Sequence, residues 1–348
     1  MKNRLKTGMI DADDLLRRVS RSFYITLRVL PRAVRPQLSL AYLLARATDT
    51  VADTDAIAVD KREQVLSSLR LCIQAASARQ KPSVPDLSAF LQTGNSGASA
   101  KDNAERALLK NFETLLDALL EFSEADRKKI RSVLETITQG QQADIRRFSA
   151  TSERLKALVT DAELDAYTYE VAGCVGEFWT RLCLAHVFPQ VLQDEKQLMS
   201  DAVRFGKGLQ LVNILRDLPE DLRLGRCYIP EQSLTKFGLT PADLLNHDAM
   251  PRFRPLYNGY LELAEDHLRA GWHYTTSLPF GCVRVRLASA WPILIGVESL
   301  RRLRNGNVLG DPRVKITRRE IRRILVKTIC LYPFRKAWNR LFYKPGYS

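Results

Sequence analysis

Apolar residues recur at the spacing of a single helix face along most of this chain. Alternation of the kind that strands require does not persist over any useful length. The pattern predicts helices over residues 15–19, 36–51, 62–76, 105–122, 128–148, 161–187, 197–217 and 257–274. We therefore expect an all-α protein.

The connections between these stretches carry the residues that break helices. Residues 82–100, rich in Gly and Ser, predict a mobile surface loop. Residues 224–241 predict a structured turn and a short helix, with Thr240 capping a helix that starts at Pro241. Because no repeat or interdomain linker interrupts the pattern, we expect one catalytic domain over residues 1–310, followed by a distinct segment over residues 311–348.

The net charge of the chain limits the kinds of molecule that it is expected to bind. The 348 residues are 45% hydrophobic and 26% charged, as in ordinary globular proteins, but their net charge is +14. Such an excess of basic residues indicates that the protein binds nucleic acid, an anionic membrane or a polyanionic small substrate. No helix-turn-helix, zinc-finger or RNP signature supports nucleic acid, which we exclude.

Several features predict a cytoplasmic protein. The six cysteines are scattered without a Cys-x-x-Cys pair, which is typical of buried thiols in a reducing compartment. The N-terminus lacks the apolar core of a signal peptide. No stretch approaches the ~20 apolar residues that a membrane span requires.

The segment over residues 317–343 differs from the rest, since Glu320 is its single acid. Its basic residues are Arg318, Arg319, Arg322, Arg323, Lys327, Arg335, Lys336 and Arg340. Aromatic and aliphatic residues alternate with them at helical spacing, which suits an anionic membrane interface. A last helix packed on the body with a solvated basic face has the same composition, and both interpretations stay open.

Two pairs of aspartates carry the candidate chemistry. Asp49 and Asp53, and likewise Asp217 and Asp221, stand four residues apart, so each pair shares one helix face. Like charges at this spacing repel, which suggests a compensating cation. Mg²⁺ fits, because it takes hard oxygen ligands and is usually bound by one or two carboxylates together with substrate phosphates.

The neighbours of these pairs matter more than the spacing. Asp161 and Asp165 have the same spacing at a predicted helix start, where acids stabilise the helix dipole without a metal. Arg46 precedes Asp49 by one turn, and Arg216 directly precedes Asp217. We therefore expect the four aspartates on two facing helices to hold Mg²⁺ and a diphosphate, with the two arginines stabilising the departing group.

Four segments, in order over roughly residues 15–300, resemble the signatures of the squalene and phytoene synthase family. They are Ser20-Arg21-Ser22-Phe23, Tyr42-Leu-Leu-Ala-Arg46-Ala-Thr-Asp49-Thr-Val-Ala-Asp53, Tyr167-Thr-Tyr-Glu-Val171-Ala172-Gly173-Cys-Val-Gly176, and Asn213-Ile-Leu-Arg-Asp217 followed by Glu220-Asp221 and Gly225-Arg226-Cys-Tyr-Ile-Pro230. The resemblance implies an isoprenoid synthase fold, in which helices surround an apolar cavity. It also implies head-to-head (1′–1) coupling of two prenyl diphosphates through a cyclopropyl diphosphate.

The same resemblance implies roles for individual residues. Asp49, Asp53, Asp217 and Asp221 would bind Mg²⁺, and Tyr167 would act in proton transfer, with Arg46 and Arg216 as its catalytic companions. The implied substrate-binding residues are Ser20, Arg21, Ser22, Phe23, Tyr42, Val171, Ala172, Gly173, Gln210, Asn213 and Arg226.

Two details favour squalene synthase chemistry within the family. The motif Asp-Thr-x-x-Asp and the run Val314-Lys315-Ile316 resemble squalene synthases, in which Lys315 and Arg318 would bind the phosphate of NADPH. The alternative for that run is the basic start of a membrane-facing helix. A Rossmann site is excluded, because no Gly-x-Gly-x-x-Gly follows a strand.

We therefore expect a cytoplasmic enzyme, bound peripherally to the membrane, that converts two farnesyl diphosphates through presqualene diphosphate into squalene. The alternatives are a phytoene or dehydrosqualene synthase that performs no reduction, and a presqualene diphosphate synthase. A helical protein that binds anionic lipids without catalysis is the alternative from another class.

Overall fold

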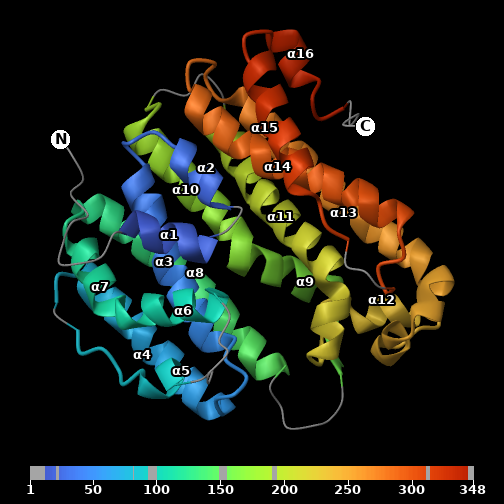
Figure 1. The fold of residues 1–348 in the computed structure, drawn as a ribbon, viewed down its shortest axis with the longest axis horizontal. Coiled ribbons are helices and arrows are strands. Elements are labelled where there is room, and N and C mark those ends of the chain that lie inside the picture. The colour runs from blue at the N-terminus through green and yellow to red at the C-terminus, as the bar shows by residue number, and fades with distance from the viewer. Residues whose placement is uncertain are drawn as a thin grey trace. The chain divides into compact units, whose positions relative to one another are not determined.

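The computed structural model describes residues 12–20, 23–80, 82–92, 100–148, 155–189, 194–310 and 314–343. Apart from one pair of two-residue strands, the regular elements of these residues are all helices or helical turns, which confirms the predicted all-α class (Figure 1). The chain divides into two compact units: unit 1 is Met1–Ser149 with Arg181–Val187, and unit 2 is Ala150–Thr180 with Phe188–Ser348. The domain boundary at residue 310 stays a prediction.

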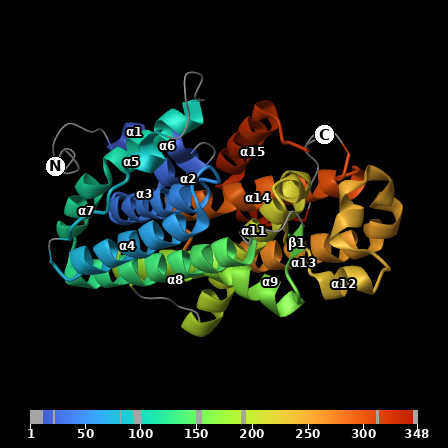
Figure 2. The same cartoon turned by 90° about the horizontal axis from the view of Figure 1, so that it is seen from below.

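Unit 1 is a bundle built around its third helix. Its elements are α1 (Ala12–Ser20), α2 (Phe23–Val29), α3 (Arg35–Ala52), α4 (Val59–Ser77), α5 (Ser88–Gln92), α6 (Ala100–Lys110), α7 (Phe112–Leu120) and α8 (Glu124–Phe148). Helix α3 packs on α4, α7 and α8, and α4 runs beside α8 (Figure 2). Leu40, Leu44, Ala47 and Val51 are among the buried residues of α3, whereas Asp49 is half-buried and Asp53, at the C-cap of the helix, is exposed.

Unit 2 is built in the same way around one long helix. Its elements are β1 (Lys156–Ala157), α9 (Asp161–Thr168), the π-helical turn η1 (Tyr169–Gly173), α10 (Cys174–His186, of which residues 181–186 belong to unit 1), α11 (Glu195–Arg223), β2 (Arg226–Cys227), α12 (Glu231–Thr235), the 3-10 turns η2 (Pro241–Leu245) and η3 (His247–Ala249), α13 (Met250–Ser277), α14 (Val283–Asn305), α15 (Arg318–Leu331) and α16 (Arg335–Asn339). Strands β1 and β2 pair in parallel. Helix α11 packs on α13 and α14 through a stripe formed by Leu211, Leu215, Leu218 and Leu222.

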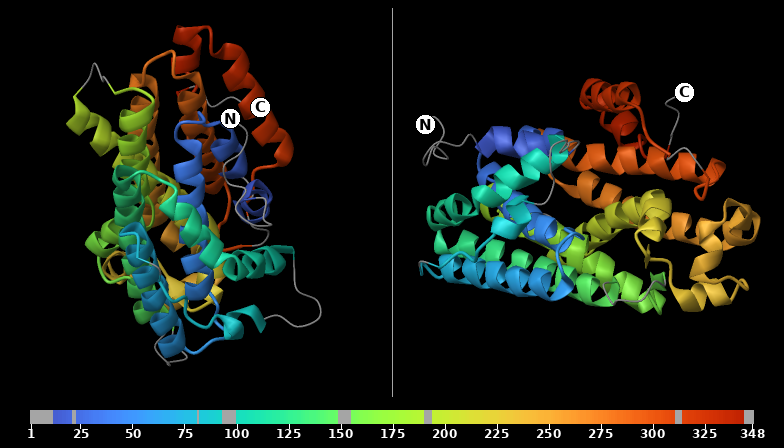
Figure 3. Two further views of the ribbon diagram at one scale, coloured as in Figure 1. Left: turned by 90° about the vertical axis from the view of Figure 1, so that its left-hand side faces the viewer. Right: turned by 60° about the horizontal axis from the view of Figure 1, so that its bottom comes forward.

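The C-terminal helices belong to unit 2. Helix α15 packs on α14 and is followed by α16, and Figure 3 shows both in red against the orange α14. Among the helices that the structure describes, none is long and apolar enough to cross a membrane.

Three of the predicted elements differ from the structure. The helix predicted over residues 105–122 breaks at Asn111, because the side-chain amide of Asn111 donates to the Ala107 carbonyl (2.6 Å) and competes with the backbone ladder. The helix predicted over residues 161–187 contains the π-helical turn η1. The loop predicted over residues 82–100 contains α5, which buries Phe90, while residues 93–99 lie outside the described part of the chain.

The prediction for residues 224–241 is confirmed. Helix α12 is the short helix, and Thr240 caps the turn that begins at Pro241. The Thr240 amide donates to the Asp243 carboxylate (2.7 Å), and the Thr240 hydroxyl accepts from the Asp243 amide (3.4 Å). These two bonds form a capping box.

Two glycines let η1 and α10 approach α11 at backbone contact. A Cβ atom on Gly206 would lie 2.2 Å from the Ala172 carbonyl oxygen, and one on Gly176 would lie 2.0 Å from the Ala202 carbonyl oxygen. Neither position has room for a side chain. Close packing against α11 therefore explains the glycine at position 176 of the third sequence motif. The predicted substrate contacts of Val171, Ala172 and Gly173 stay a prediction.

Candidate active site

In unit 1, α3 carries an arginine that is joined to two carboxylates. The Arg46 guanidinium donates to Asp49 on the same helix and to Glu105 on α6. Burial by itself lowers the pKa of Arg46, but the two carboxylates outweigh it and raise the pKa above the ordinary value for arginine. Arg46 therefore stays positively charged beside the first aspartate of the predicted metal pair.

Glu105 is a residue of this group that the sequence did not indicate. It is separated from Arg46 by 59 positions and belongs to none of the four motifs. Only the packing of α6 on α3 brings it to the acidic helix. A single sequence contains no local signal that identifies such a partner.

The first and second motifs meet on this side of α3. The Phe23 ring stacks on Tyr42 with centroids 5.5 Å apart, and the Tyr42 hydroxyl donates to the Val19 carbonyl (3.4 Å). Ser20 is buried, and its hydroxyl donates to the Leu16 carbonyl (2.5 Å) at the end of α1. Arg21 and Ser22, which complete the first motif, lie outside the described residues.

In unit 2, α11 carries a corresponding pair. The Arg216 guanidinium donates through Nε and Nη2 to both oxygens of Asp217, at 2.8 and 2.7 Å. These hydrogen bonds raise the pKa of Arg216, against the opposing effect of burial. In both units, an arginine predicted to bind diphosphate thus contacts an aspartate predicted to bind metal.

The other predicted residues of α11 share the face that the leucine stripe leaves outward. Gln210 accepts from the Asn213 side-chain amide at 3.5 Å. Asp221 is half-buried, as is Arg226 in β2 just beyond the helix. The structure therefore brings the residues of the fourth motif to one side of α11 and to its C-terminal end.

A proline inside α11 is compensated by a buried tyrosine. Pro219 has no N–H, so it cannot donate to the Leu215 carbonyl one turn earlier. The hydroxyl of Tyr257, which is fully buried on α13, donates to that carbonyl instead (2.9 Å). Because the bond lies one residue before Arg216, it supports the backbone that carries the Arg216–Asp217 pair.

Replacing Tyr257 with phenylalanine is expected to lower the free energy of unfolding by about 1–3 kcal/mol, because a buried carbonyl loses its partner. Pro219→Ala restores an amide N–H that can donate to the Leu215 carbonyl, so the variant that combines both substitutions should recover most of the loss. Urea denaturation of the wild type, the two single variants and the double variant measures both effects. An equal loss in the single and double variants would show that the hydroxyl acts elsewhere.

Tyr167 lies in α9 with a partner that the motifs did not indicate. Its ring stacks on Tyr228, which follows β2, with centroids 4.7 Å apart and planes inclined at 21°. Tyr228 is buried, while Tyr167 is half-buried. The stacking fixes the ring plane of the residue predicted to transfer protons.

The acidic pair of α9 has protein partners on both members. The Asp161 carboxylate accepts from the hydroxyls of Tyr260 (2.5 Å) and Ser233 (2.9 Å). The Asp165 carboxylate accepts from the Lys207 ammonium (2.6 Å). As predicted, the pair stands at a helix start, since α9 begins at Asp161.

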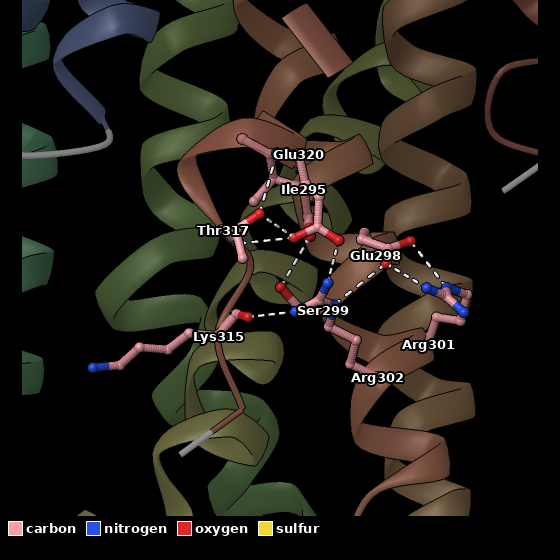
Figure 4. A network of polar contacts seen from close by, with 8 residues as sticks. All are labelled: Ile295, Glu298, Ser299, Arg301, Arg302, Lys315, Thr317 and Glu320. Atoms are coloured by element: carbon pink, nitrogen blue, oxygen red, sulfur yellow. Dashed lines mark hydrogen bonds and ion pairs between the residues drawn. The ribbon is translucent and has the colours of Figure 1, made fainter. Parts of the chain in front are cut away.

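The predicted cofactor residues flank the start of α15. Lys315 is exposed, its carbonyl accepts from Arg302 Nη1 (2.5 Å), and its side chain points away from the polar network around it (Figure 4). Arg318 is the exposed first residue of α15. Arg302 therefore holds the backbone of Lys315 while the two cationic side chains face outward.

Comparison with known proteins identifies relatives over most of the chain. Residues 16–320 match the model of the family described as Squalene/phytoene synthase. A bifunctional lycopene cyclase/phytoene synthase of Blakeslea trispora is 31% identical over 68% of this chain, which spans only 35% of that longer protein. A presqualene diphosphate synthase of Zymomonas mobilis is 29% identical over 75% of this chain and 74% of its own length.

Solved structures support the fold. A complex of TcSQS with the ligand E5700 superposes with a TM-score of 0.72 at 22% identity and covers 95% of this chain and 94% of its own. The squalene synthase HpnC from Alicyclobacillus acidocaldarius gives a TM-score of 0.60 at 18% identity, covering 85% of this chain and 92% of its own. The predicted isoprenoid synthase fold is confirmed.

Proposed function

Because this chain belongs to the squalene/phytoene synthase family, whose members join two prenyl diphosphates head to head, we propose that it converts two farnesyl diphosphates through presqualene diphosphate into squalene. One observation carries the proposal. Both aspartate-rich helices hold an arginine against their first aspartate, so a carboxylate that can take up a cation stands beside a guanidinium that can bind a diphosphate.

The donor set fits Mg²⁺. Asp49 in α3 and Asp53 at its C-cap, like Asp217 and Asp221 in α11, offer two carboxylates at a spacing of four residues, and Mg²⁺ takes one or two carboxylates besides phosphates and waters. Within the described residues, no group of three or more His, Cys, Asp or Glu side chains gathers as a metal site. We propose Asp49 and Asp53, and Asp217 and Asp221, as the ligands. Bound Mg²⁺ supplies the positive charge that stabilises a departing diphosphate.

The arginines would serve the same purpose from the protein side. Arg46 and Arg216 each hold a carboxylate oxygen and keep a permanent positive charge next to it. When that carboxylate takes up a cation, the guanidinium becomes available to the diphosphate oxygens, which it binds with bidentate geometry. The two ion pairs would thus couple cation binding to diphosphate binding.

We assign the remaining roles on the same basis. Tyr167, held against Tyr228, would transfer the proton in the first half-reaction. Phe23, Val171 and Ala172 would contact the prenyl chains, where exclusion of water protects a carbocation from being quenched. Lys315 and Arg318 would bind the phosphate of NADPH, because both are exposed cations at a helix start that Arg302 holds in position.

Presqualene diphosphate synthase is the second candidate. It is favoured by the Zymomonas mobilis relative, which matches this chain over about three quarters of both lengths. Such an enzyme performs the first half-reaction and has no use for NADPH.

Incubation of the purified protein with farnesyl or geranylgeranyl diphosphate and Mg²⁺, with and without NADPH, tests the proposal by analysis of the extracted lipids. We expect squalene, formed from farnesyl diphosphate only when NADPH is present. Presqualene diphosphate under both conditions would establish the second candidate. Phytoene or dehydrosqualene would overturn the reduction step, and the absence of product from either substrate would overturn the enzymatic proposal.

A further inference from the structure

We propose that the outward side of α15 and α16 is a docking surface for an anionic lipid bilayer. We call this surface the α15–α16 face. Its members are exposed basic and apolar residues: Arg319, Arg322, Val326, Ile329, Phe334, Arg335, Lys336 and Arg340. The inference concerns where the protein works and is independent of the reaction proposed above.

Helix α15 has an inner and an outer side. Ile324 and Thr328 are fully buried, and with Tyr332 they form a stripe against the rest of unit 2. On the opposite side, Val326 is 52% exposed and Ile329 is 51% exposed. A helix with a merely solvated outer face would carry polar residues at these two positions. The inner stripe therefore explains how the helix packs, and the outer apolar residues need another explanation.

The first turn of α15 is anchored to α14 by a chain of ion pairs (Figure 4). The buried Glu298 carboxylate accepts from Arg301 (2.7 Å) and Arg302 (3.4 Å). Arg302 also donates to Glu320, which accepts from the backbone amide of Thr317 (2.9 Å) in a capping box. The orientation of α15 is thus fixed at its N-terminus.

The other end is anchored by an arginine among aromatic rings. The buried Arg286 guanidinium lies 4.7 Å from the Trp338 ring centroid and donates to the Leu278 carbonyl (2.7 Å). Trp338 stacks on Trp272 (4.9 Å) and donates to the Thr328 carbonyl (3.1 Å). Helices α15 and α16 are therefore held on unit 2 at both ends, which presents their outer side in one orientation.

The charge of the face has one sign. Glu320, the single acid over residues 317–343, is occupied by Arg302 and by the cap of its own helix. Arg319, Arg322 and Lys336 are exposed, and this segment contains no acid other than Glu320. A surface of this kind complements an anionic lipid layer, in which each basic residue near the headgroups adds to binding.

The apolar members distinguish a bilayer from a soluble polyanion. Phe334 is 64% exposed. Phe280, which is not a member of the face, is 41% exposed and stacks on Tyr332 where α15 ends (centroids 4.9 Å). Exposed aliphatic and aromatic side chains among arginines and lysines are typical of interfacial helices, whose apolar residues enter the headgroup boundary. A soluble acidic protein or nucleic acid would use the cations and leave these side chains in water.

Sedimentation of the full chain with phosphatidylcholine vesicles, with and without phosphatidylglycerol, tests the surface. We expect binding that requires phosphatidylglycerol and that falls by on the order of thirtyfold in Arg322→Glu/Ile329→Ser. The matched control is Lys236→Glu/Phe237→Ser, which makes the same kinds of change at an exposed pair on unit 2 beyond α12. Equal loss in both variants, or no binding of the wild type, would overturn the proposal.

A spectroscopic measurement separates lipid insertion from charge attraction alone. Cys330 is exposed on α15 beside Ile329, and the other cysteines are buried except for Cys282, which is half-buried. Cys282→Ser removes this second accessible thiol, so that the dye labels Cys330 alone. An environment-sensitive dye on Cys330 should shift to the blue when phosphatidylglycerol vesicles are added, and the shift should survive moderate salt. An unshifted dye on bound protein, or binding by Ile329→Ser equal to that of the wild type, would mean that the face recognises charge only, against our proposal.

Discussion

Replacing Asp217 with asparagine is expected to lower turnover of prenyl diphosphate by at least about a thousandfold while leaving the helical content unchanged. Both carboxylate oxygens of Asp217 accept hydrogen bonds from Arg216. Asp217 is also the first of the two Mg²⁺ ligands that we propose on α11. An amide of the same shape removes its negative charge, so the cation loses a ligand and the guanidinium loses its partner. Product formation and circular dichroism measure the two expectations.

The chain contains a matched control for this variant. Asp165 belongs to a pair of aspartates with the same spacing. Its partner is Lys207, whereas Asp49 and Asp217 contact the motif arginines Arg46 and Arg216. Asp165→Asn should therefore retain turnover within a few-fold of the wild type. If Asp217→Asn stayed active, or if both variants lost activity alike, the metal assignment of Asp217 would be wrong.

Replacing Gly206 with alanine is expected to lower the free energy of unfolding by about 3 kcal/mol or more. The added Cβ would lie 2.2 Å from the Ala172 carbonyl oxygen, so a backbone segment has to move before α11 can pack on η1. The midpoint of urea denaturation measures the loss. Because η1 follows directly on the helix of Tyr167, reduced turnover should accompany it.

Gly259 in α13 is the control for this second variant. It is exposed, and a Cβ built there meets no atom within 4 Å. Gly259→Ala should therefore raise the free energy of unfolding by about 0.5–1 kcal/mol, through helix propensity alone. Equal effects at the two glycines would contradict the close approach of η1 and α11.

Periodicity predicted most of the long helices, although α2 and α14 were not among the predicted elements. The stripe that includes Leu40 and Leu44 predicts which side of α3 is buried, and Asp49 follows on the other side. The same reasoning places Asp217 opposite the leucines of α11. These predictions succeed because an apolar stripe at helical spacing has to face the core, whatever lies across from it. Motif order then identified the family.

Local features of single residues limited how accurately the sequence predicted where helices begin and end. Asn111 ends α6 with its own side chain, and the π-helical turn η1 interrupts an apolar pattern that continues through it. Periodicity over a long window averages across such single-residue events, so it predicted one helix where the structure has two or three elements.

The partners of the site residues were decided by tertiary packing. Glu105 reaches Arg46, Tyr257 reaches the carbonyl that Pro219 leaves without a donor, and Tyr228 stacks on Tyr167. In each case the two residues are far apart in the chain, and their meeting depends on how whole helices cross.

The C-terminal segment shows the same division. Its composition was compatible with a packed helix and with a membrane interface. Packing buries Ile324 and Thr328 and leaves Val326 and Ile329 exposed, and the membrane interface stays a proposal. A sequence records which residues are apolar, but burial depends on the surface that each one meets, and only the folded chain supplies that surface.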